Sequence, residues 1–154
     1  MLFYPLKFKS ALKKKIWGSE SWELCDYGTD ASIIDNGVFK GQSIADVIKQ
    51  YPTEMLGREI AKQYGRLPLL FKFIDARDKL SIQVHPNDEY ALKNENSFGK
   101  TEAWYVVSAD SNAKIICGLK KVLSKEEVLS GIKNANLENN LNEINVKRGE
   151  CYFV

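Results

Sequence analysis

The residues best suited to chemistry lie in the segment 80–90, which contains the only histidine of the chain, His85. Alternate side chains of a β-strand point to opposite faces. Read as a strand, residues 80–85 therefore place their apolar side chains on a core face and Ser81, Gln83 and His85 on the opposite face. The spacing predicts a strand with one polar face that could hold a site.

A second cluster follows in the stretch Gly-Lys-Thr-Glu-Ala-Trp at residues 99–104, where Lys100 and Glu102 share a strand face. Zinc accepts imidazole nitrogen and carboxylate oxygen at about 2.0–2.2 Å. His85 and Glu102 are therefore candidate zinc ligands, and Gln83 is a weaker, neutral one. From the spacing alone, the alternative remains that these residues lie on a half-exposed sheet face that binds no metal. A catalytic zinc normally has three protein ligands, so a further strong ligand would be another carboxylate or come from outside the chain.

Other catalytic classes have less support. The sequence has no G-x-x-x-x-G-K-[ST], G-x-G-x-x-G or G-x-S-x-G motif. A dyad of His85 with a distant cysteine stays open, although Cys117 and Cys151 lie in apolar strand patterns that favour buried, unreactive thiols.

Composition indicates a single globular domain. The 154 residues are 44% hydrophobic and 27% charged, which argues against disorder. A net charge of +2 gives no reason to expect a nucleic-acid or membrane partner. The only basic run, Lys13 to Lys15, is interpreted as a solvated loop or strand edge.

The three cysteines are far apart, and their odd number without a signal sequence indicates free thiols in a reducing compartment. No apolar stretch of 18 residues follows the N-terminus. These features predict a cytoplasmic protein.

Apolar periodicity and turn residues predict a chain rich in short strands with helices between them. Ser43 and the pair Ser124 and Glu127 provide helix N-caps, the pair forming a capping box. The expected strands are 6–8, 22–25, a buried strand at 69–75, then 80–85, 103–107, 113–117 and 151–154; the expected helices are 43–51, 53–64, 124–132 and 137–144.

The sequence ends inside the apolar pattern Cys-Tyr-Phe-Val, without a polar tail. Chain ends normally fray at the surface. We therefore expect that the chain stops within its fold.

Several of these segments together resemble type I mannose-6-phosphate isomerase. The resemblance rests on Gln-Val-His-Pro and Gly-Lys-Thr-Glu in this order and spacing, and it extends over essentially the whole chain. The matching stretches are 21–24, 36–37, 68–75, 79–91, 99–105 and 146–154.

The resemblance implies a cupin-like jelly roll, mainly β with helices and incomplete at its C-terminus, forming one catalytic domain over residues 1–154. It implies a zinc enzyme that interconverts mannose 6-phosphate and fructose 6-phosphate by enediol-type proton transfer. Gln83, His85 and Glu102 match three family metal ligands. Ser81 and Lys100 match positions that line the sugar-phosphate pocket, and Lys100 is the residue expected to assist catalysis.

In the family, a later histidine completes the metal site, and this chain stops before the segment that supplies it. We therefore expect little isomerase activity from this chain. The alternative is a cupin-derived module without activity, which either binds a sugar phosphate or pairs its open sheet edge with another copy to form a homo-oligomer. A cupin metalloenzyme of another reaction class fits the match at 79–91 less well.

Overall fold

The computed structural model describes residues 4–154, which fall into two compact units: a first unit that ends at Leu80 and a second unit formed by Ser81–Val154. The prediction of one domain over the whole chain stays a prediction.

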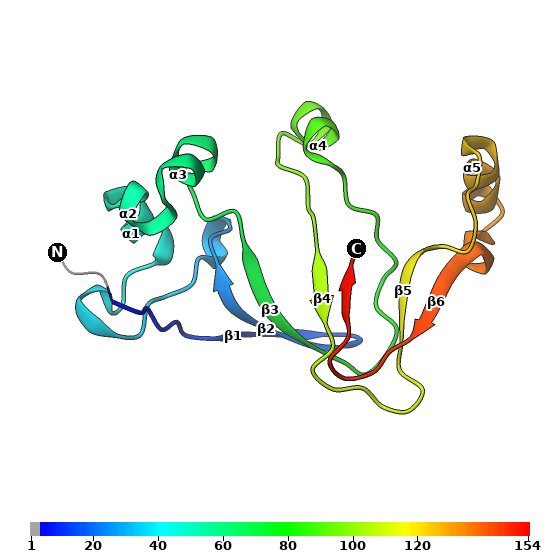
Figure 1. The fold of residues 1–154 in the computed structure, drawn as a ribbon, viewed down its shortest axis with the longest axis horizontal. Coiled ribbons are helices and arrows are strands. Elements are labelled where there is room, and N and C mark those ends of the chain that lie inside the picture. Colours follow the sequence, from blue (N-terminus) through cyan, green and yellow to red (C-terminus); the bar gives the residue numbers. More distant parts are fainter. Residues whose placement is uncertain (1–3) are drawn as a thin grey trace. The chain divides into compact units, whose positions relative to one another are not determined.

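The first unit contains an antiparallel sheet of β1 (Ala11–Lys15), β2 (Gly18–Cys25) and β3 (Leu70–Ala76), with β2 in the centre (Figure 1). β1 carries the three consecutive lysines on the outer strand, which confirms that this basic run lies at a strand edge. Gly18 begins β2 at φ +147°, and a Cβ there would collide with the carbonyl of Asp75. The residue at this close approach of β2 to β3 must therefore be glycine.

Three short helices follow the sheet's first two strands: α1 (Ile44–Gln50), α2 (Pro52–Leu56) and α3 (Arg58–Tyr64). The predicted N-cap of α1 is present, because Ser43 Oγ accepts a hydrogen bond from the backbone amide of Asp46. The prediction of one helix over 53–64 is wrong. Gly57 has φ +76°, a value that an α-helix cannot contain, so the segment divides into α2 and α3.

The core of the first unit lies under α1. Its centre is formed by Ile34, Phe39 and Val47, all nearly inaccessible to solvent. The partly buried side chains that surround it are Tyr4, Leu6, Phe8, Tyr51 and Met55. Two single-turn 3-10 helices lie in the connection before α1, at Gly28–Asp30 and Gly37–Phe39.

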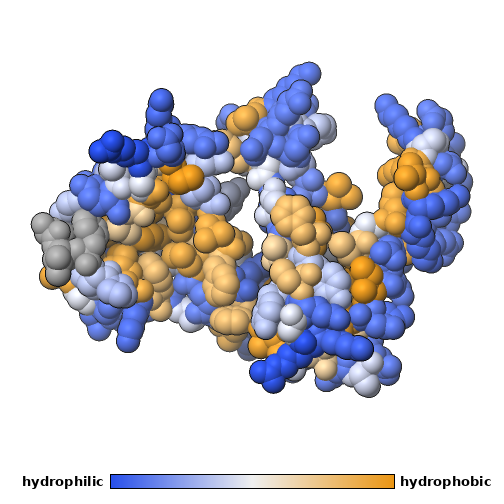
Figure 2. All heavy atoms as spheres, viewed as in Figure 1, coloured by the Kyte–Doolittle hydropathy of each residue, from blue (hydrophilic) through white to orange (hydrophobic). Residues whose placement is uncertain are grey.

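The strand predicted at 69–75 is present as β3, but the prediction that it is buried is wrong. Phe71 and Phe73 are about half exposed and contact each other edge to face at 5.6 Å. The intervening Lys72 points to the other side, where it meets Glu20. Because alternate residues face opposite sides, only one side of this strand is covered, and apolar residues remain visible at the surface (Figure 2).

The second unit has two antiparallel two-stranded sheets, β4 with β7 and β5 with β6, and two α-helices (Figure 1). The predicted capping box of α5 is confirmed. Glu127 Oε2 accepts a hydrogen bond from the amide of Ser124, and Ser124 Oγ accepts one from the amide of Glu127. The elements in order are α4 (Asp88–Asn94), β4 (Ala103–Tyr105), β5 (Lys114–Leu119), α5 (Lys125–Lys133), the 3-10 helix Leu137–Asn140, β6 (Leu141–Asn145) and β7 (Cys151–Phe153).

Two element predictions in this unit are wrong. Residues 80–85 form no strand within the described chain, since they join no ladder, and Val84 is 95% exposed instead of facing a core. The helix predicted over 137–144 is a 3-10 turn followed by β6, which pairs Ile144 with Ile115 of β5. Pairing with a distant strand outweighs the local helical spacing of the leucines.

The fold is therefore mixed α/β. Within residues 4–154 the sheets are small and open, and no jelly roll is present. The described residues also contain no helix that is long and apolar enough to cross a membrane.

Candidate active site

The predicted site residues of the second unit meet at one carboxylate, that of Glu102. His85 Nε2 lies 3.3 Å and Lys100 Nζ 3.2 Å from Glu102 Oε1. The other carboxylate oxygen, Oε2, accepts a hydrogen bond from Trp104 Nε1 at 3.1 Å. The side chains of His85 and Glu102 are 22% and 19% exposed, so the cluster is shielded but still open to solvent.

Backbone contacts bring the two sequence segments together. The amide of Lys100 donates to the carbonyl of Pro86 at 3.1 Å, and the amide of Gly99 donates to Asp88 Oδ1 at 2.8 Å. The chain between these contacts forms α4, whose N-cap is Asn87 (Figure 1). A short capped helix therefore returns the chain to the residue that follows His85.

Gly99 permits this approach. A Cβ at this position would lie 2.6 Å from Asn87 C and 2.7 Å from Pro86 O, both backbone atoms that cannot move aside. The glycine that precedes Lys100 is thus required by close packing of two backbone segments.

The pairing of β4 with β7 fixes Glu102 from the other side. The amide of Val154 donates to the carbonyl of Glu102 at 3.0 Å, and Ala103 lies opposite Phe153. Glu102 is therefore held by backbone hydrogen bonding just before β4 begins.

The surroundings keep Glu102 ionised. Burial raises the pKa of this carboxyl, but the hydrogen bonds from Trp104 and Lys100 and the charges of Lys100 and His85 outweigh it, and the pKa lies below its usual value. A carboxylate that remains charged is suited to binding a cation.

The other two predicted residues form a second pair. Gln83 Nε2 donates to Ser81 Oγ at 2.8 Å, although these residues do not form the expected strand. Both side chains are exposed. The amide oxygen of Gln83, which is the atom a metal would use, does not take part in this bond.

The donor atoms of His85 and Glu102 are compatible with a bound zinc ion. Two ligand atoms at 2.0–2.1 Å from a tetrahedral zinc are about 3.3–3.4 Å apart, and the observed separation is 3.3 Å. Lys100, however, lies against the same carboxylate oxygen and would compete with a cation.

Across residues 4–154, no group of three or more His, Cys, Asp and Glu side chains is placed to hold a metal ion. The predicted set contains only two such side chains, His85 and Glu102, together with the amide of Gln83. Zinc binding therefore stays a prediction.

A cysteine–histidine dyad gains no support. The Cys117 thiol donates to the carbonyl of Phe153 at 3.8 Å, and the imidazole of His85 faces Glu102. The expectation of a buried thiol at Cys151 is wrong, because Cys151 is exposed. Burial raises the pKa of the Cys25 thiol, which keeps it protonated.

The sequence analysis did not identify the contact of Trp104 with Glu102. The available signal was its spacing, because residues i and i+2 of a strand share a face and Trp104 follows Glu102 by two.

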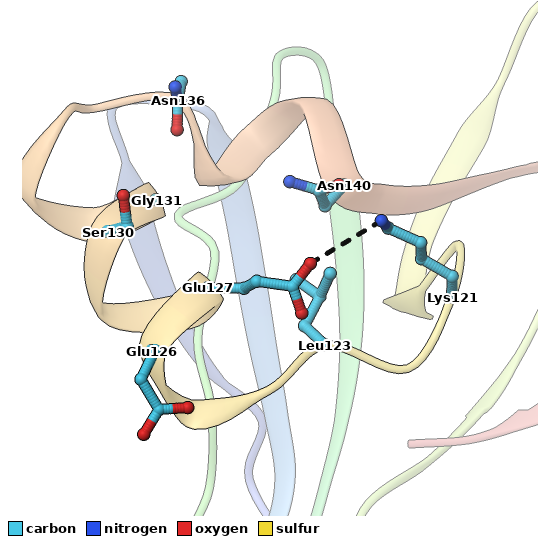
Figure 3. Close-up of a pocket in the computed structure, with 8 residues that line it drawn as sticks. All are labelled: Lys121, Leu123, Glu126, Glu127, Ser130, Gly131, Asn136 and Asn140. Carbon is cyan, nitrogen blue, oxygen red and sulfur yellow. Dashed lines mark ion pairs between the residues drawn. The ribbon is translucent and has the colours of Figure 1, made fainter.

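An open hollow beside α5 contains none of the predicted site residues (Figure 3). Most of its lining residues have polar or charged side chains, and Lys121 forms an ion pair of 3.8 Å with Glu127. The lining residues are Lys121, Leu123, Glu126, Glu127, Ser130, Gly131, Asn136 and Asn140.

Comparison with known proteins identifies the family. Residues 19–114, more than half of the chain, match the family described as phosphomannose isomerase type I, catalytic domain. The chain belongs to the type I phosphomannose isomerase family. The match includes the Gln83–His85 segment and the Lys100–Glu102 segment.

Alignments with individual relatives extend beyond residues 19–114 and cover nearly the whole chain. A mannose-6-phosphate isomerase from Streptococcus mutans is 36% identical over 167 residues, covering 97% of this chain and 51% of the relative. A mannose-6-phosphate isomerase from Bacillus subtilis is 33% identical, and the alignment again covers 97% of this chain and 51% of the relative. The chain thus spans about half the length of the curated relatives it matches.

A solved structure shows the same fold. The crystal structure of mannose 6-phosphate isomerase from Bacillus subtilis superimposes with a TM-score of 0.88 at 31% identity, covering 97% of this chain and 52% of that chain. A phosphomannose isomerase from Salmonella typhimurium is similar in fold, with a TM-score of 0.71 at 17% identity.

Proposed function

We propose that this chain carries part of the active site of an aldose–ketose isomerase that interconverts mannose 6-phosphate and fructose 6-phosphate. Family membership supplies the substrate class. The observation that supports a site on this chain is the convergence of His85 and Lys100 on a single oxygen of Glu102.

In this proposal Gln83, His85 and Glu102 bind one divalent metal ion, taken to be zinc. The donor set combines an imidazole nitrogen, a carboxylate oxygen and an amide oxygen. When bound, the ion would polarise the sugar oxygens and favour the enediol-type intermediate.

Lys100 is proposed as the catalytic residue of this chain. Its ammonium group lies beside Glu102 and is about half exposed, so it can reach a ligand in solvent. There it would attract the phosphate or stabilise negative charge on the sugar oxygens as the proton moves between C1 and C2. Ser81, exposed on the neighbouring segment, would line the same sugar-phosphate pocket.

A coupled assay for fructose 6-phosphate, run with and without added Zn²⁺, tests the function. We expect slow metal-dependent turnover, because three ligand side chains are assigned and one of them, Gln83, is a weakly binding amide. The zinc-dependent rate should disappear in His85→Ala, and Lys100→Met should reduce the rate without abolishing zinc binding. Turnover that is equal without zinc, or unchanged in His85→Ala, contradicts the proposal.

The second candidate is a module without activity that pairs its sheet edges with another copy. The two-stranded sheets of Ser81–Val154 leave outer edges unpaired within that unit, and Tyr105 and Phe153 are 64% and 75% exposed. Light scattering separates the candidates. A stable dimer without turnover favours the module, whereas a monomer with zinc-dependent turnover excludes it.

A further inference from the structure

We propose that Trp104 is a positioning residue, which orients the Glu102 carboxylate so that its Oε1 atom faces His85 and Lys100. This inference rests on the proposed function in one respect, since it assumes that Glu102 is a metal ligand. The contact itself is independent of any metal: the indole N–H of Trp104 donates to Glu102 Oε2 at 3.1 Å.

The orientation follows from the division of contacts between the two oxygens. A carboxylate can rotate about its terminal torsion, which has a broad energy profile. With Oε2 bonded to the indole, Oε1 is the atom left to face His85 at 3.3 Å and Lys100 at 3.2 Å. Loss of the indole bond would free this rotation and disperse Oε1 over several positions.

The tryptophan itself is well fixed. It occupies the middle of β4, directly opposite Tyr152 of β7, and is partly buried. Its side chain has only two rotatable bonds, so holding it costs little conformational entropy compared with a lysine.

The chemistry of indole suits this role. Its N–H is a donor only and carries no charge. It therefore restrains the carboxylate without neutralising it, whereas Lys100 on the other oxygen reduces the charge available to a cation. A neutral donor on Oε2 leaves the negative charge directed at the position where a metal ion would bind.

The first unit contains the same arrangement in a different setting. Trp22 Nε1 donates to Glu20 Oε2 at 2.8 Å, again from two residues further along the chain, and Lys72 Nζ donates to Glu20 Oε1 at 2.7 Å. The Glu20 side chain is 8% exposed, and its two oxygens are taken by the tryptophan and the lysine. Trp22 and Glu20 provide a matched control, because here the indole hydrogen bond supports the Lys72–Glu20 ion pair and no proposed metal ligand.

The test compares Trp104→Phe with Trp22→Phe in the complete chain. Zn²⁺ affinity is measured by calorimetry, and the visible spectrum of bound Co²⁺ reports the coordination geometry. Supporting groups of metal ligands typically contribute about 10- to 100-fold in affinity. We expect Trp104→Phe to weaken Zn²⁺ binding by a factor in this range and to alter the Co²⁺ spectrum, whereas Trp22→Phe should change neither.

A Zn²⁺ affinity of Trp104→Phe within twofold of wild type overturns the proposal. Glu102→Ala separates this failure from failure of the metal site. If Glu102→Ala binds Zn²⁺ as wild type does, the ligand assignment is wrong; if only Trp104→Phe is without effect, the positioning role alone is wrong.

A second measurement does not depend on folding of the Trp104 variant. The three tryptophans give three indole N–H signals in a ¹⁵N-correlated NMR spectrum of the metal-free chain. Glu102→Gln should shift the Trp104 signal and leave the Trp22 signal in place. An unmoved Trp104 signal would show that the contact is absent and would refute the proposal.

Discussion

Replacing Glu20 with glutamine should destabilise the first unit by about 1.5–2 kcal/mol at neutral pH, since a hydrogen bond to a charged group contributes about 1.5–3 kcal/mol. Glutamine keeps the size of the side chain but replaces one accepting oxygen with an NH₂ group. Either Lys72 or Trp22 then loses its acceptor. The Lys72 side chain is 24% exposed and can recover some hydration, which places the expected loss at the lower end of the range.

Urea unfolding followed by circular dichroism measures this loss. Lys72→Met and the double variant complete a thermodynamic cycle that isolates the coupling between the two side chains. We expect a coupling free energy of about 1 kcal/mol or more, because contacting residues in one network couple at this level. A Glu20→Gln protein as stable as wild type, or zero coupling, would refute the reasoning.

The same variant predicts a pH dependence. Burial raises the pKa of Glu20, but the hydrogen bonds from Lys72 and Trp22 and the charges of Lys72 and Lys15 outweigh it, so the pKa lies below the usual value of 4.5. A carboxyl with a lower pKa in the folded state stabilises fully above its unfolded pKa and loses this contribution as pH falls through the folded value. The difference between wild type and Glu20→Gln should therefore hold from pH 7 to pH ~5 and shrink below that. A difference that grows on acidification contradicts the assignment.

Two further variants test the second unit. Ser124→Ala removes the N-cap of α5 and should lower the free energy of unfolding by about 1 kcal/mol, which is measured as a reduced urea midpoint. Ser124→Asp, which can still cap the helix, is the control. An equal loss of stability in both variants would contradict the capping role. Gly99→Ala forces a Cβ against the backbone of Pro86 and Asn87 and should cost about 1–3 kcal/mol and weaken Zn²⁺ binding. Gly118→Ala strains the backbone, because Gly118 has φ +74°, but its Cβ would meet no other atom. An equal effect of the two substitutions on Zn²⁺ affinity would count against the close-packing explanation for Gly99.

Local signals predicted much of the helical structure. The cap at Ser43 and the capping box of Ser124 and Glu127 could be predicted because a few neighbouring residues determine a helix cap. The break at Gly57 could not be located by apolar spacing, since the leucine and isoleucine pattern continues across it. α4 was missed, although Asn87 followed by two acidic residues is an ordinary helix start.

Strand predictions failed where pairing with distant residues decides the outcome. Residues 80–85 alternate as a strand should, yet they join no ladder within the described chain. The apolar residues of β6 fit a helix locally, but hydrogen bonds to β5 determine their conformation. Periodicity describes a segment's faces and carries no information about its partner.

The candidate site was predictable only in part, because spacing relates residues within one segment but not residues of different segments. Two-residue spacing correctly placed Ser81 beside Gln83 and Lys100 beside Glu102. The meeting of His85 with Glu102 depends on the contacts of Lys100 with Pro86 and of Gly99 with Asp88, which no spacing rule gives. Donor chemistry made His85 and Glu102 candidate ligands of one ion, and the family resemblance matched both segments to one site, but neither gave the contacts that bring the segments together.

The most direct test of the central claim is the zinc content of the purified chain, compared among wild type, His85→Ala and Glu102→Ala by elemental analysis after dialysis against a Zn²⁺ buffer. Glu126→Ala, an exposed carboxylate of α5 in the same unit, is the matched control. We predict one zinc per chain in wild type and in Glu126→Ala, and loss of most of the metal in the other two variants. Equal zinc in all four proteins would contradict the site at Glu102.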